Sequence, residues 1–597
     1  MNEQIQTCPT LDDAFKEAFA LCAQAKKQGR RPVILAQTPS AVLGVRRALA
    51  AAGEGFGVEV ETLPHWVTSL WELFGDGRTP CSHALRIALA AKLVHAQDVL
   101  PPTPGTVNLL ARATRQALIY RSNQATLAGN EHAFVALMDA FASHLDQIGA
   151  CEYCQMLEAL SLQPRGDIYA PIVFDASPEL LCNAERFFAA SAGATFLTVE
   201  LGTPSSSERT DELSHLVERL FQRTENDAAV EASGSVVCAL AAGPTAQNRL
   251  VGACVESALS QAESEATIVV AAKDPVALFE FCAPIISKQE ANAQIGASKR
   301  FCDTDAGRAV VASLDLVDEH ASLDKLEAAD YSFNPFAGIR FAEAFRLDQM
   351  HRGDRLIAPP SLLSNLAGNA SDQLKITLLL FSDAKYAEAL DAFEGFADTA
   401  FAARPLYRSE QLHALGIARE ALAAAGALGA PAKLTLESVA NQGVPINAAL
   451  SGKPGAPTVL FTTLANAAEL APASVDSLVI SDLNVDSYPV RLQENALTTL
   501  LCKWGVHSDQ SPLAVQRSWL FRAISSARKH VYLQRSLNDC EAGPQQAAVL
   551  FDDVMDCYRA HLSDYSDVDK NLGLPSSLVP FAMQAGEELL LDRKSVV

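Results

Sequence analysis

The sequence predicts an α/β protein with two lobes, each built on a parallel sheet and each interrupted by a mostly helical insertion. Short apolar runs of strand length alternate with segments of helical periodicity in two separate regions. The strand signals disappear from 81 to 165 and again from 331 to 443, where helical patterns continue. With 49% hydrophobic and 20% charged residues the chain is globular, and its 597 residues exceed what a single core supports.

The first lobe is predicted to comprise residues 1–80 and 166–202, with the insertion at 81–165 between them. Its predicted strands are, in chain order, residues 33–36, 58–63, 172–174 and 196–199. Pro39 marks a turn after the first of these, and Ser40 is a candidate N-cap for the helical pattern that follows. Trp66 and Trp71 lie on the next helical pattern, where they could stack on nucleic-acid bases or pack in the core.

The second lobe is predicted to comprise residues 235–330 and 444–537, with the insertion at 331–443 between them. A polar, acidic linker at 203–234 precedes the lobe, and a tail at 538–597 follows it. The predicted strands lie in the strings "SVVCALAA", "ATIVVAA", "PTVLFTT", "VDSLVIS" and "KHVYLQRS". A long helix is predicted between Pro512 and Lys529.

The exit from the strand "VDSLVIS" is unusually polar. Asp482, Asn484 and Asp486 follow this strand in place of a tight turn into a helix. Open α/β sheets bind their ligands at the carboxyl ends of strands. This exit is therefore a candidate ligand-binding edge.

The charge distribution limits the function classes. A net charge of −23 argues against a chain that simply coats nucleic acid, because phosphate contacts need Lys and Arg. Two windows are nevertheless basic. Residues 511–538 contain no acidic residue, and the only charges between 99 and 130 are arginines. These windows could bind a polyanion or could be ordinary solvated helix faces.

The lack of targeting signals and the cysteine usage predict a cytoplasmic protein. No apolar run approaches the length of about 18 residues that would cross a bilayer, and the first residues have no signal-peptide pattern. Cys151 and Cys154 form the only close cysteine pair and lack a second pair at zinc spacing, so reduced core thiols are expected.

Three strings near the C-terminus resemble motifs of superfamily I helicases of the UvrD/RecB type. In "TVLFTTLANAAELAPASVDSLVISDL", Thr463 matches the start and Glu469 the end of one motif. In "SWLFRAISSARKHVYL", Ala523, Ala527 and Arg528 match the last motif. Leu483, Asp486 and Pro489 in "VISDLNVDSYP" fall in register with the motif between them. The order of these strings and of "IVFDASPELL" is most similar to the AddB/RecC-type subunit of bacterial helicase-nucleases.

The resemblance implies two RecA-like lobes of the P-loop NTPase type and a role in double-strand-break repair and recombination. It implies single-stranded DNA and an active AddA-type motor subunit as partners, with no membrane partner. The DNA-contact residues that it suggests are Arg517, Arg522, Arg528, Lys529, Arg112, Arg115, Thr463 and Asn484.

The departures from the family indicate a degenerate ATP site. The sequence contains no GxxxxGK[ST] phosphate loop, and the segment in its place has Thr10 or Asp12 as a helix cap. Asp175 occupies the position of the magnesium carboxylate, but Ala176 follows where active members carry Glu. The motif arginine that contacts the γ-phosphate aligns with Ser526. Arg528 would lie about 200° away around a helix. No ATPase activity and no cofactor are therefore expected.

The chain also departs from the family in its C-terminal region. The Asp…Glu-x-Lys cluster of a metal-dependent nuclease and the clustered cysteines of an iron-sulfur staple are not found. We expect either a fragment or a chain in which this domain is missing.

Two alternatives remain open. One is an active ATP-dependent helicase with a diverged nucleotide loop, which would use ATP and magnesium. The other is a nucleotide-sugar transferase with two Rossmann-like lobes, against which stands the lack of a GxGxxG after the first strand.

Overall fold

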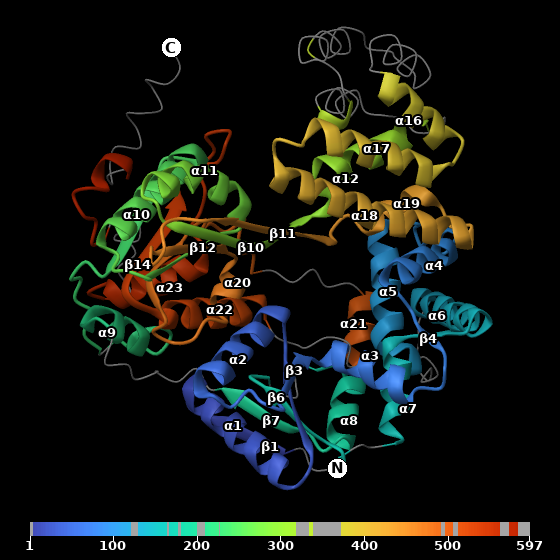
Figure 1. The fold of residues 1–597 in the computed structure, drawn as a ribbon, viewed down its shortest axis with the longest axis horizontal. Helices are drawn as coiled ribbons and strands as arrows, with labels where there is room; N and C mark the ends of the chain where they lie inside the picture. Colours follow the sequence, from blue (N-terminus) through green and yellow to red (C-terminus); the bar gives the residue numbers. More distant parts are fainter. Residues whose placement is uncertain are drawn as a thin grey trace. The chain divides into compact units, whose positions relative to one another are not determined.

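The computed structural model describes residues 4–120, 129–163, 166–176, 181–199, 209–225, 227–317, 334–337, 345, 372–490, 496–504, 511–561 and 572–582 (Figure 1). The chain forms two compact units. The first unit comprises Met1–Phe74, Leu157–Ala297 and Asn447–Val597, and the second comprises Gly75–Met156 and Ser298–Ile446.

The first unit contains a five-stranded sheet, called here the first sheet. Its strand order is β1 (Gln4–Cys8), β7 (Thr195–Val199), β6 (Tyr169–Phe174), β2 (Arg31–Ala36) and β3 (Glu59–Thr62), and all neighbours are parallel. The strands predicted from the sequence in this region are therefore confirmed. Parallel strands run in one direction, so their carboxyl ends lie along one edge of the sheet.

Helices cover both faces of the first sheet. The covering helices are α1 (Leu11–Lys27), α2 (Pro39–Ala52), α3 (Leu63–Phe74) and α8 (Asn183–Ser191). Buried alanines of α1 and valines of α2 share a core with Ile34 and Phe174. Thr10 caps α1, as predicted, by accepting a hydrogen bond from the Asp13 amide. The cap of α2 is Thr38 and not Ser40, because the helix already begins at Pro39.

The first unit also carries most of a seven-stranded sheet, called the second sheet. Its strand order is β11 (Gly443–Leu450), β10 (Asn292–Arg300), β12 (Thr458–Thr462), β9 (Thr267–Ala271), β13 (Val475–Ile480), β14 (Ala527–Ser536) and β8 (Val236–Ala241). The pairs from β10 to β8 are parallel. The predicted α/β class with parallel sheets is therefore confirmed.

Helices from distant parts of the sequence pack on the second sheet (Figure 1). They are α9 (Asp211–Arg219), α10 (Pro244–Gln261), α11 (Pro275–Lys288), α20 (Leu464–Ala467), α22 (Pro512–Ser526) and α23 (Val549–Tyr558), and α21 (Ala496–Lys503) precedes α22 in the chain. The core of the sheet includes Leu213 of α9 and Phe551 of α23. Residues within the expected linker and the expected tail thus contribute to this core.

The second unit is mainly helical. Its elements are α4 (His83–His95), α5 (Pro104–Ala117), α6 (Gly129–Ile148), α12 (Asp305–Val317), α16 (Asp372–Ser382), α17 (Tyr386–Ala400), α18 (Pro405–Leu428) and α19 (Ala432–Ser438), with the short parallel pair β4 (Thr79–Pro80) and β5 (Ala150–Cys151). Helix α7 (Tyr153–Ser161) crosses the boundary between the units. Helix α4 packs on α18, and α5 packs on α19, so the two stretches of this unit share one body.

A buried ion pair fixes the amino end of α4. Arg86 donates from Nε and Nη2 to the two carboxylate oxygens of Glu152, each at 2.8 Å. A third bond joins Arg86 Nη2 to the Cys81 carbonyl at 2.9 Å. Both side chains are buried, and the paired geometry offsets the desolvation of the two charges.

Across the described ranges, no helix combines the length and the apolar character that crossing a bilayer requires.

Candidate functional site

Asp175, the predicted remnant of a magnesium ligand, lies directly after β6 at the carboxyl edge of the first sheet. Its φ of 54° is in the left-handed region, which Asp tolerates better than most residues. Gln37, after the adjacent strand β2, donates from Nε2 to the Asp175 carbonyl at 2.6 Å. The backbone around Asp175 is therefore fixed by a neighbouring strand end.

The Asp175 carboxylate is bound by Arg522 of α22. Arg522 Nη2 donates to Oδ1 at 2.8 Å, and Nη1 donates to Oδ2. The two side chains are 20% and 27% exposed, so the pair is partly shielded from solvent. A planar guanidinium matches both carboxylate oxygens at once, which makes this geometry strong and directional. The sequence predicts different roles for these two residues, a magnesium ligand and a DNA contact, and the structure brings them together.

A second contact lies beside this pair. Thr38 accepts a hydrogen bond from the Ala41 amide at 3.1 Å and donates its own hydroxyl proton to Glu469 Oε1. Burial raises the pKa of Glu469; the hydrogen bond from Thr38 and the charge of Arg522 oppose this, while the charge of Asp175 adds to it. Glu469 lies just after α20, within the string that resembles the helicase motif.

The residues at this edge do not fit a magnesium-nucleotide complex. In nucleotide sites the protein usually holds magnesium through one or two carboxylates, but both oxygens of Asp175 accept hydrogen bonds from Arg522. After β1, where a phosphate loop would lie, the hydroxyl of Thr10 bonds to the amide and the carboxylate of Asp13. Asp12 and Asp13 in the first turn of α1 place negative charge where phosphates would need positive charge.

The polar exit of β13 forms a closed hydrogen-bond network. Gln247 of α10 donates from Nε2 to Ser481 Oγ and to Asp482 Oδ1, both at 2.9 Å. The Lys273 amide, after β9, donates to Asp482 Oδ2 at 3.2 Å. Burial raises the pKa of Asp482, and the hydrogen bond and charge of Lys273 oppose the shift. The network joins the carboxyl ends of β9 and β13 to α10.

Asn484 belongs to the same edge. Its side chain is buried, donates from Nδ2 to the Ser536 carbonyl at 2.7 Å, and accepts from the Ser536 amide at 3.0 Å. Asn484 therefore mimics a strand partner for the end of β14. Because the side-chain amide of Asn484 bonds to the backbone of Ser536, this polar residue has a structural role at the end of the sheet.

Three other predicted DNA-contact cations also bond to carboxylates. Arg517 binds Asp553 at 2.8 and 2.6 Å and lies over the ring of Phe221. Arg528 bonds to Asp476, and Lys529 bonds to Glu263 at 2.7 Å and approaches Asp476 at 3.4 Å. These cations would have to exchange partners to contact a phosphate.

The predicted DNA contacts of the second sheet do not form one surface. The helix expected to reach Lys529 ends at Ser526, so Arg528 lies on β14 and not on a helix. Arg528 and Lys529 lie at the amino end of β14, whereas Thr463 and Asn484 follow the carboxyl ends of β12 and β13. Parallel strands place these two sets at opposite edges of the sheet.

The remaining predicted residues have simple placements. Ser526 is buried and donates to the Ala523 carbonyl at 2.7 Å, and Thr463 caps α20. Arg112 and Arg115 are exposed on α5 in the second unit, and Arg115 lies 5.3 Å from the ring centre of Tyr153. Arg121, in the same basic window, lies outside the described residues.

The tryptophans and the close cysteine pair are structural. Trp66 and Trp71 are buried, which favours core packing over base stacking. Cys151 and Cys154 are buried thiols, and burial raises their pKa values to about 11 and about 12. In the part of the chain that is described, no group of three or more His, Cys, Asp or Glu side chains could hold a metal ion.

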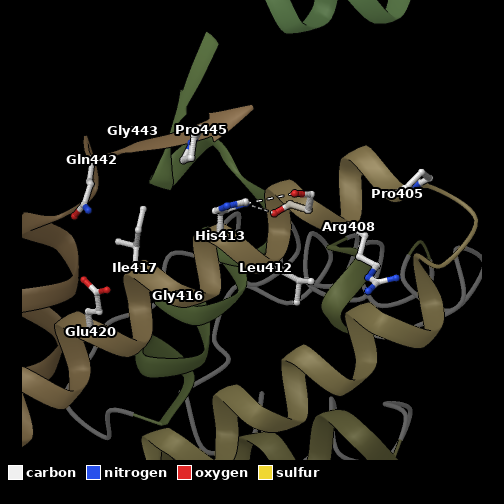
Figure 2. A pocket seen from close by; sticks show the side chains of 11 residues that line it. Pro405, Arg408, Leu412, His413, Gly416, Ile417, Glu420, Gln442, Gly443 and Pro445 are labelled. Carbon is white, nitrogen blue, oxygen red and sulfur yellow. Dashed lines mark hydrogen bonds between the residues drawn. The ribbon is translucent and has the colours of Figure 1, made fainter. Parts of the chain in front are cut away.

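A groove of about 750 Å³ lies in the second unit, between α18 and the start of β11 (Figure 2). Arg408 and Glu420 give it opposite charges, and Arg408 is bonded to Asp398 at 3.0 Å. His413 Nδ1 lies 2.8 Å from the Ser409 carbonyl. This balance of charge does not favour a polyanion.

Sequence reasoning missed Gln247, Glu469 and Asp476 as partners. Each of these three residues bonds to a residue more than 50 positions away in the chain, and no local sequence pattern signals such a pairing.

Comparison with known proteins gives no family assignment, since no protein-family model and no curated protein matches the sequence.

Proposed function

We propose that this chain is a helicase-like, DNA-processing subunit with a degenerate ATP site. It holds or scans single-stranded DNA in the cytoplasm beside an active AddA-type motor subunit during repair and recombination of double-strand breaks. In this proposal the two sheets with their helices are RecA-like lobes, and residues 81–165 and 331–443 are the two mostly helical insertions.

The architecture supports the proposal. Both sheets are dominated by parallel strands, and in each case two strands of the same sheet are separated by a stretch whose described residues are mostly helical. The helical stretches pack on each other through α4 and α18 in the second unit. Fold similarity alone does not assign chemistry, so the activity is argued from the site.

The observation that carries the proposal is the occupation of Asp175 by Arg522. A motor of this class needs a divalent cation to bridge the terminal phosphates and neutralise developing charge. Here the only acidic residue predicted to hold that cation bonds through both oxygens to a fixed guanidinium. Such a body can guide a strand without hydrolysing ATP.

The DNA-binding part of the proposal depends on the first basic window. Arg112 and Arg115 lie three residues apart on α5, and both are exposed. With a net charge of −23, the chain offers little cationic surface for tight autonomous binding. A partner subunit that completes a basic channel would strengthen DNA binding, because the electrostatic attraction of DNA depends on the summed charge of the whole complex.

Phosphate release from ATP with saturating single-stranded oligonucleotide tests the proposal. The wild-type chain should release phosphate at the background rate of an Asp175→Ala variant. The Asp175→Ala protein is the matched control, because contaminating ATPases would be unaffected by it. DNA-stimulated release that Asp175→Ala abolishes would contradict the proposal and favour an active helicase.

A further inference from the structure

We infer that Arg522 and Asp175, supported by Thr38 and Glu469, form a permanent clamp between the first and second sheets, in which the guanidinium takes the place of a dissociable cation. The clamp goes beyond the proposed function, because it concerns how the two sheets are held and requires neither DNA nor nucleotide.

The clamp residues belong to different sheets of the first unit. Asp175 ends β6 of the first sheet, whereas Arg522 is on α22, which packs on β13 and β14 of the second sheet. The residues are 347 positions apart in the chain. The bidentate contact is therefore a tertiary connection and not a local surface pair.

The second contact makes the connection a two-point attachment. Thr38 and Asp175 follow β2 and β6, which are adjacent parallel strands. Glu469 and Arg522 come from the region of α20 and α22, which pack on each other. The contacts Asp175–Arg522 and Thr38–Glu469 therefore attach the first sheet to the second sheet at two points. Two points of attachment resist rotation of one sheet against the other as well as their separation. The bond from Gln37 Nε2 to the Asp175 carbonyl joins the two loops on the first-sheet side.

Helix α2 approaches the loop that carries Glu469 closely. A Cβ added at Gly44 would lie 3.6 Å from the Glu469 carbonyl oxygen, which is an ordinary van der Waals distance. The side chains of Asp175 and Arg522 are 20% and 27% exposed, and this partial burial lowers the local dielectric constant and strengthens the ion pair.

The chemistry of the guanidinium makes the clamp independent of conditions that open a metal site. Arg stays protonated at every physiological pH, and its fork is covalently attached to α22. A chelator cannot remove it and a nucleotide is not needed to bring it in. The relative position of the two sheets should therefore not respond to magnesium, chelator or ATP.

Distance measurements between spin labels test the clamp in the full-length chain. Genetically encoded labels at the exposed positions Arg47 on α2 and Glu256 on α10 report on the two sheets. The wild-type chain should give one narrow distance distribution that is unchanged by magnesium-ATP or by EDTA. Arg522→Ala should lose that narrow distribution and add a longer-distance population.

Arg517→Ala is the matched control. Arg517 is on the same helix and makes an equally bidentate pair, but its partner Asp553 belongs to the second-sheet side. This variant should keep the narrow distribution. If Arg522→Ala fails to fold, Arg522→Lys keeps the charge without the fork and should broaden the distribution.

A wild-type distribution that shifts with magnesium-ATP, or a folded Arg522→Ala or Arg522→Lys protein with the wild-type distribution, would overturn the clamp. Neither result depends on DNA binding. The failure of the clamp and the failure of the proposed function are therefore distinguishable.

Discussion

Arg528 and Asp476 lie on the adjacent parallel strands β14 and β13, and the guanidinium donates twice to Asp476 Oδ1, at 3.0 Å from Nε and 2.9 Å from Nη2. Oδ2 of the same carboxylate accepts from the Thr267 amide at 3.0 Å. Asp476 is buried, so the three contacts join the amino ends of β9, β13 and β14.

Replacing Arg528 with Ala should therefore destabilise the protein. The buried Asp476 carboxylate would lose its main charge partner, and we expect a loss of about 1–3 kcal/mol in the free energy of unfolding. Urea denaturation measures this loss. Lys453→Ala is the control, because Lys453 pairs with Glu290, whose side chain is 55% exposed, and such surface pairs contribute about 0–1 kcal/mol. Equal effects from both variants would contradict this account of the strand ends.

DNA affinity should respond most to the exposed arginines of α5. The double variant Arg112→Ala with Arg115→Ala removes two exposed charges from the first basic window. At low salt we expect a loss of single-stranded DNA affinity of about tenfold and a shallower salt dependence. Fluorescence anisotropy over a salt series measures both. Arg517→Ala, whose charge is already paired with Asp553, should change the salt slope less. The opposite ranking would transfer the DNA contact to the second sheet.

Much of the strand and helix order could be predicted from the sequence, because apolar runs in buried parallel strands are local signals. The apolar run 33–36 lies within β2, and 172–174 lies within β6. The cap at Thr10 was also readable, since a hydroxyl three residues before a free amide is a local pattern.

The site could not be predicted in the same way. Whether Asp175 holds a metal or an arginine depends on which helix of the second sheet reaches it, and Arg522 is 347 positions away. The sequence predicts a helix that reaches Lys529, because "SARK" continues the helical pattern, whereas pairing between β13 and β14 draws the chain into a strand from Ala527 onward. Tertiary context outweighed local propensity there.

Trp66 should behave as a core residue. Its ring packs edge-on against Tyr169 at 5.9 Å between centroids and tilted against Phe188 at 5.6 Å. Trp66→Ala should cost about 3–5 kcal/mol in unfolding free energy, by the usual range for large-to-small core changes. Leu73→Ala on the same helix, where Leu73 is 67% exposed, should stay within about 0.5 kcal/mol of wild type. A stable Trp66→Ala protein with weakened DNA binding would favour base stacking instead.

Glu469→Gln should change the pH dependence of stability. Because burial raises the pKa of Glu469, the folded chain binds this proton more tightly than the unfolded chain does. The contribution of Glu469 to stability therefore falls as pH rises from the ordinary Glu value through the raised value. The variant should be more stable than wild type at neutral pH, and this gain should vanish in acid.

Thermal unfolding between acid and neutral pH measures the effect of Glu469→Gln. Glu263→Gln is a control of opposite sign, because the hydrogen bond from Lys529 lowers the pKa of Glu263. Glu263→Gln should therefore be less stable than wild type at neutral pH, and this difference in stability should disappear as pH falls. If Glu469→Gln shows the same trend as Glu263→Gln, the assignment of a raised pKa to Glu469 is wrong.

Binding of a labelled single-stranded oligonucleotide across a salt series, with and without magnesium-ATP, tests the central claim most directly. The account predicts saturable binding in which the logarithm of the association constant falls linearly with the logarithm of the salt concentration. At constant ionic strength, this association constant should not change when magnesium-ATP is added. Absence of binding at low salt, or an affinity that magnesium-ATP changes, would contradict it.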